Sequence, residues 1–118
     1  MNTIINVQQL LTKGQSALAI FTRGGHFHLN EEDKTGSSGN WVIRPDVMCD
    51  KVIIYLRQSE SNRVYIADFV GTRHANEDKR QVVLFRNTHL AGITASNWRQ
   101  FANGSQQPAQ RIVKDAIR

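Results

Sequence analysis

The sequence lacks the features of disulfide-stabilised, secreted and membrane-spanning chains. Cys49 is the only cysteine among 118 residues, which excludes an intrachain disulfide and suits a reducing compartment. No uninterrupted apolar run approaches the roughly 20 residues that a membrane helix needs. The first residues carry neither the basic start nor the small-residue cleavage site of a signal peptide. We therefore expect a cytoplasmic protein with no membrane partner.

The sequence also lacks the signatures of common catalytic and nucleotide-binding sites. Cys49 is followed by Asp50, whose negative charge disfavours the reactive thiolate. The Gly-flanked segment 36–39 lacks the lysine of a phosphate-binding loop. The acidic residues 31–33 are adjacent in sequence, and we expect them to be solvated. These absences favour a protein that is not an enzyme, and no cofactor is predicted.

What the chain does have is a strong excess of basic residues. At 13.4 kDa, it is predicted to form a single domain over residues 1–118. Its net charge is +5 and its isoelectric point is near 9.9. Arginine, which pairs with phosphates and stacks on bases, is the commoner basic residue. A small basic domain of this kind is typical of proteins that bind RNA or DNA.

A β-hairpin at the centre of the chain is the clearest structural prediction. Two runs rich in β-branched and aromatic residues, 50–57 and 62–71, flank a polar break. The remaining predicted strands are shorter and cover residues 16–22, 26–29, 41–44 and 81–85. Polar loops are expected at 30–40 and 72–79.

Helices are predicted towards both ends of the chain. Ile4, Val7 and Leu11 recur at helical spacing within residues 3–13. Thr94 is a candidate cap for a short helix over 95–102, and Pro108 suits the first turn of a last helix. The predicted fold class is therefore α+β, with a small mixed or antiparallel β-barrel flanked by N- and C-terminal helices.

Residues 41–86 resemble the PUA-like group of small barrels, which includes the EVE, ASCH and YTH-type domains. The resemblance rests on a strand from Trp41 to Pro45, an Asp50-to-Tyr55 strand, and a strand that ends at Gly71. Cys49 stands where that pattern usually has glycine. The resemblance implies a nucleic-acid reader with an aromatic pocket for a modified or flipped base. The implied pocket walls are Trp41, Tyr55 and Phe69, and the implied phosphate contacts are Arg57, Arg73, Lys79 and Arg80.

Two other functions are consistent with the sequence. His26, His28, Glu32 and Gly39 resemble the first metal motif of cupins, which would make the chain a metal-dependent enzyme or small-ligand binder. The same residues also suit a Gly-Gly hairpin with two exposed histidines. A compact basic domain without a catalytic constellation also fits a protein-interaction or inhibitor module, or a homo-oligomer.

Overall fold

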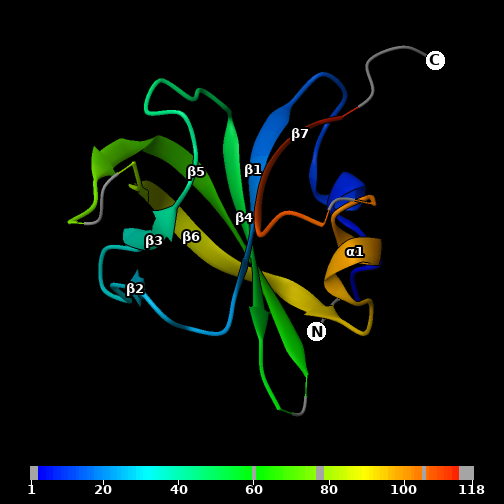
Figure 1. Cartoon of the computed structure of the whole chain (residues 1–118). Helices are drawn as coiled ribbons and strands as arrows, with labels where there is room; N and C mark the ends of the chain where they lie inside the picture. Colours follow the sequence, from blue (N-terminus) through cyan, green and yellow to red (C-terminus); the bar gives the residue numbers. More distant parts are fainter. Residues whose placement is uncertain (1–2, 60, 77–78, 105, 115–118) are drawn as a thin grey trace.

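In the computed structural model, the chain forms a seven-stranded mixed sheet (Figure 1). The structure describes residues 3–59, 61–76, 79–104 and 106–114. The strand order is β2-β3-β6-β5-β4-β1-β7, and all neighbouring strands are antiparallel except β1 and β4. The strands are β1 (Ser16–Thr22), β2 (Phe27–Leu29), β3 (Gly36–Trp41), β4 (Lys51–Arg57), β5 (Asn62–His74), β6 (Gln81–Thr94) and β7 (Ala109–Val113).

The parallel pair β1 and β4 lies in the interior. Residues 17–20 and 52–56 are all buried, and because successive side chains of a strand point to opposite faces, both faces of this pair are covered. Two parallel strands cannot be joined by a tight turn. Residues 23–50 form the crossover between them, and β2 and β3 lie within it. The predicted central hairpin is confirmed as β4 and β5, which pair from Lys51–Asp68 to Arg57–Asn62.

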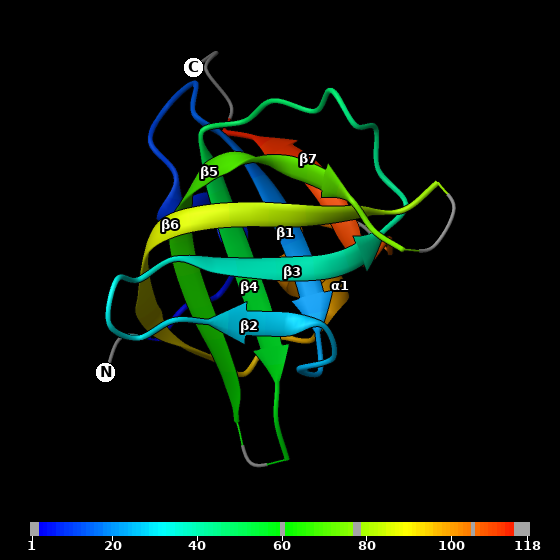
Figure 2. The ribbon, with the colours of Figure 1, turned by 90° about the vertical axis from the view of Figure 1, so that its left-hand side faces the viewer.

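The core consists of two clusters, one on each face of the sheet. In the first, the N-terminal segment and the helix α1 (Trp98–Phe101) pack against β1, β4 and β5. The second includes side chains from each of the seven strands, with Phe27 of β2 and Ala109 of β7 both packed against it. Figure 2 shows why: β2, β3 and β6 lie across β1 and β4, so the sheet curls around its own inner face.

Irregularities in β5 and β6 allow the sheet to curl. Their register shifts between Val64 and Tyr65, between Ile66 and Asp68, and between Phe69 and Gly71. Each extra residue bends a strand and increases its twist. The two longest strands can therefore take part in both halves of the sheet. β2 and β7 lie at opposite ends of the strand order and are not paired with each other, so the predicted barrel is not closed.

The predicted N-terminal helix over 3–13 is wrong. The segment contains only the 3-10 turn η1 (Val7–Leu10), and Ile4 donates a backbone hydrogen bond to the carbonyl of Ile93. Pairing with the end of β6 holds this part of the chain extended. The apolar side chains that suggested a helix are nevertheless buried in the first core cluster.

The predicted C-terminal helix is also wrong, and the helix predicted before it, over 95–102, is shorter than expected. Residues 109–113 form β7, which pairs with β1 at the edge of the sheet. The α1 helix covers Trp98–Phe101, and the side chain of Asn97, rather than Thr94, caps it by accepting from the amide of Gln100. No helix in the described part of the chain is long and apolar enough to cross a membrane.

Two segments predicted as polar loops are partly strands. Residues 36–41 form β3 and pair with β6, while β5 continues to His74. Both segments have few apolar side chains, but backbone hydrogen bonding does not require them. The strand predicted at 41–44 overlaps β3 only at Trp41.

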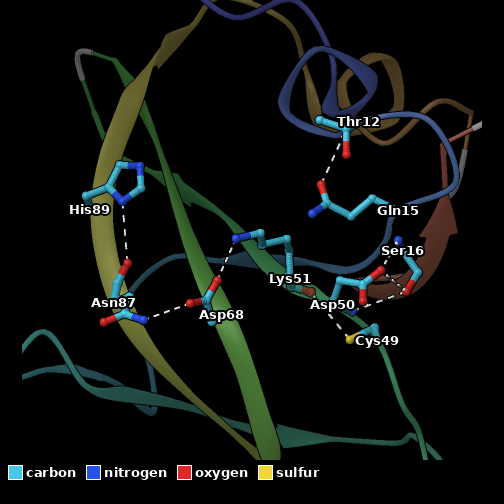
Figure 3. Close-up of polar contacts among 9 residues, drawn as sticks. All are labelled: Thr12, Gln15, Ser16, Cys49, Asp50, Lys51, Asp68, Asn87 and His89. Carbon is cyan, nitrogen blue, oxygen red and sulfur yellow. Dashed lines mark hydrogen bonds and ion pairs between the residues drawn. The ribbon is translucent and has the colours of Figure 1, made fainter.

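Polar side chains link β4 to its neighbours (Figure 3). Asp50, just before β4, accepts from the amide of Ser16 at 2.8 Å. Lys51 forms an ion pair with Asp68 at 2.5 Å, and Asn87 donates to the second oxygen of this carboxylate at 2.8 Å. The hydrogen bond from Asn87 and then that from Lys51 hold the pKa of Asp68 below its usual value. These contacts fix the register of β4, β5 and β6.

The contact between Gly36 and Phe85 gives a test of the β3–β6 pairing. A Cβ at Gly36 would lie within 2.7 Å of the His28 carbonyl oxygen and would overlap the Phe85 ring. We expect Gly36→Ala to lower the free energy of unfolding by about 1–3 kcal/mol. Gly71→Ala is the matched control, because nothing lies within 4 Å of its added Cβ. Urea titration of both variants measures the difference, and equal stabilities would contradict this packing.

Candidate nucleic-acid interface

One face of the sheet is covered over β1, β4 and β5 but open over β2, β3 and the first half of β6. Phe85 and Val83 point into the second core cluster, so Leu84 between them points outward. The register places Ser37 beside Leu84, and His28 beside Ser37. This outer face of β2, β3 and β6 is turned towards the viewer in Figure 2.

The bulge in β5 brings basic side chains to the same outer face. Between Phe69 and Gly71 the register shifts by one residue, after which Gly71 pairs with Leu84 and Arg73 with Val82. Arg73 lies two residues beyond Gly71 and therefore shares its face. On β6, Arg86 lies two residues beyond Leu84 and shares that face too.

Two adjoining hollows lie on this face, and a third opens beside them at the end of β5, where His74 and Gln81 point to the other face of the sheet. We call the three hollows together the basic track. The Arg86 groove has a volume of about 550 Å³ and shares Ser37 and Arg73 with the smaller Arg73 pocket, of about 190 Å³. The Arg73 pocket shares Ala75 and Asn76 with the Lys79 groove, of about 900 Å³. The three hollows therefore adjoin one another, and the Lys79 groove lies around the end of β5 from the other two.

Every charged side chain that lines the basic track within the described ranges is basic; Glu77 and Asp78, next to Lys79 in the sequence, lie outside those ranges. None of the described residues that line it is acidic. Asp46 forms an ion pair with Arg44 at the end of the Lys79 groove. Asp68 lies close to Arg86, and the positive charge of Arg86 helps to lower the pKa of Asp68. The basic lining residues are His26, His28, Arg44, Arg73, His74, Lys79 and Arg86.

The structure does not bring the three predicted aromatic pocket walls together. Tyr55 is fully buried in the first core cluster, where its hydroxyl donates to the Ser96 carbonyl at 2.7 Å. Trp41 and Phe69 pack against the second cluster, on the other face of the sheet. The Trp41 indole donates to the Ser38 hydroxyl at 3.1 Å.

The predicted phosphate contacts are divided in the same way. Arg73 and Lys79 line the basic track. Arg80 lies beside it, with its guanidinium donating to the Asn40 carbonyl at 3.2 Å. Arg57 is exposed at the far end of β4, opposite Asn62, and lines none of these three hollows.

Sequence reasoning missed Arg86 and Ser37 as members of the site. Their strands were recognised only in part, and the period-2 alternation of β6 was the one signal that could have placed Arg86 outward. His26 and His28 lie in the Arg73 pocket rather than in a metal centre. Among the described residues, no group of three His, Cys, Asp or Glu side chains could hold a metal ion.

Cys49 is not activated for nucleophilic chemistry. Burial raises the pKa of its thiol to about 11, outweighing the opposing effects of a backbone contact with Leu18 and the charge of Arg111. The neighbouring Asp50 raises it further, as the sequence indicated, although burial is the larger cause. The thiol donates to the Lys51 carbonyl at 3.4 Å.

The raised pKa of Cys49 predicts a loss of stability at alkaline pH. An unfolded thiol ionises near pH 9 while the folded one stays protonated to about pH 11, so the unfolded state releases its proton first. Between pH 9 and pH 11, the free energy of unfolding of the native chain should therefore fall by up to about 1.4 kcal/mol per pH unit. Cys49→Ala, which has no thiol, should not show this fall. Parallel denaturation curves at pH 8 and pH 10.5 measure this. An unchanged stability difference between the two proteins would rule it out.

Comparison of the chain with protein-family models, curated proteins and solved structures found no match. The fold and the site define a small β-rich domain whose curled, open sheet carries a basic track on its outer face and around the end of β5.

Proposed function

We propose that this protein is a nucleic-acid-binding domain and that a single strand of RNA or DNA lies along the basic track. The observation that carries the proposal is that the three hollows adjoin through shared lining residues, with Arg86, Arg73 and Lys79 distributed among them. A groove that follows a charged backbone needs cations spaced along its length rather than gathered at one point. The resemblance of residues 41–86 to PUA-like domains points to the same ligand class.

The surface between the cations suits the bases of an unpaired strand. Leu84 and Val70 offer apolar contacts in the Arg86 groove, and Ser37 and His28 offer hydrogen-bonding groups beside them. Unpaired bases expose both a flat apolar face and polar edges, and a mixed surface of this kind can contact both. In this proposal the base contacts come from the open part of the outer face, because Tyr55 is buried within the first core cluster and Trp41 and Phe69 pack on the inner face.

Salt dependence is the first test of the proposal. We expect the association constant of a labelled single strand of about 12 nucleotides to fall as salt rises, with a log–log slope of about −2 to −3. This slope corresponds to three or four contacted phosphates. Fluorescence anisotropy at several salt concentrations measures it, and an affinity that ignores salt would count against phosphate contacts.

Arg73→Ala tests the location of the strand. We expect it to weaken binding about three- to tenfold at low salt and to reduce the slope by about 0.7. Arg99→Ala is the matched control, because Arg99 is an exposed arginine of α1, outside the three hollows, and its loss changes the net charge equally. If both substitutions weaken binding to the same degree, the ligand does not lie on the basic track.

A further inference from the structure

The Arg73 pocket is smaller and more enclosed than the grooves on either side of it. Its volume is about 190 Å³, against about 550 and 900 Å³ for the two grooves beside it. A phosphate group, with its central atom and surrounding oxygens, fits such a space. Of the three hollows, the Arg73 pocket therefore matches a small group best in size.

The polar side chains of the pocket are suited to an anion. Arg73 contributes a guanidinium, His26 and His28 contribute imidazoles, and Ser37 contributes a hydroxyl. No acidic residue is among the described residues that line it. Within the described ranges, none of these four side chains forms a hydrogen bond or ion pair with another residue, so their donors are available to a ligand.

Backbone pairing holds the pocket open and brings its walls together. The amide of Gly39 donates to the His26 carbonyl at 3.1 Å, and Arg73 pairs with Val82 across the neighbouring strands. A Cβ at Gly39 would lie 2.9 Å from the Cγ2 atom of Val82. Glycine thus allows β3 to approach Val82 of β6 closely, and both residues line the pocket.

We propose that the Arg73 pocket is a subsite for a phosphate monoester, the terminal phosphate of a bound strand. A monoester carries a charge of about −1.5 to −2 near neutral pH and has three strong acceptor oxygens. A phosphodiester within a strand carries only one charge and two unbridged oxygens. Four donor side chains around one small pocket match the monoester better. This assignment rests on the proposed function, because the rest of the strand lies along the adjoining grooves.

The test compares one oligonucleotide with three kinds of end. We expect a 5′- or 3′-phosphate to increase affinity by about tenfold or more over the same strand with hydroxyl ends, because hydrogen bonds to a charged group are stronger than those to a neutral one. The gain should disappear in His28→Ala. It should persist in His89→Ala, because His89 is also an exposed β-strand histidine but lines none of the three hollows. Circular dichroism confirms that both variants are folded.

The outcomes separate this inference from the proposed function. If all three strands bind equally well and with the expected salt dependence, the nucleic-acid proposal stands and the monoester subsite is wrong. If no strand binds, inorganic phosphate is titrated alone. Binding of phosphate that is lost in His28→Ala supports the pocket as a site for a free phosphate compound and overturns the proposed function. The absence of both kinds of binding overturns both.

Discussion

Parallel pairing between β1 and β4 is the constraint on which the arrangement of the other strands depends. Because both strands run in the same direction, the chain between them has to return across the molecule. Its 23–50 segment does so by forming β2 and β3, which join the sheet at the far side of β6. Burial of the parallel pair on both faces then requires two separate cores. The N-terminal segment and α1 cover one face, and the curled sheet covers the other.

The same constraint creates the basic track. The first core cluster covers the outer face only over β1, β4 and β5, so the outer face of β2, β3 and β6 is left open. The bulge before Gly71 then turns the end of β5 so that Arg73 shares this face with Leu84 and Arg86. Cations and a mixed apolar and polar floor therefore come together from strands that are distant in sequence. This juxtaposition supports the proposal of a nucleic-acid ligand.

The parts of the fold that follow from local sequence were predictable, and the parts that follow from long-range pairing were not. The β4–β5 hairpin was recognisable because both strands and their turn are contiguous. The burial of Ile4, Val7 and Leu11 was also expected. Their backbone is not helical, however, because Ile4 pairs with Ile93 at the end of β6. The polar 36–41 segment gave no sign of a strand, because pairing with β6 uses only its backbone. Arg73 was identified from its charge, whereas Arg86 required the register of β6 to be known.

Backbone amide chemical shifts during titration with a single-stranded oligonucleotide measure most directly whether the outer face is the binding surface. We expect the largest changes at His28, Ser37, Arg73 and Leu84, on the four strands that form the track. The indole N–H of Trp98, which is bonded to the Gln107 carbonyl beside the first core cluster, should remain unchanged. The largest changes at α1 and β7, with the outer face of β2 and β3 unaffected, would contradict the proposed interface.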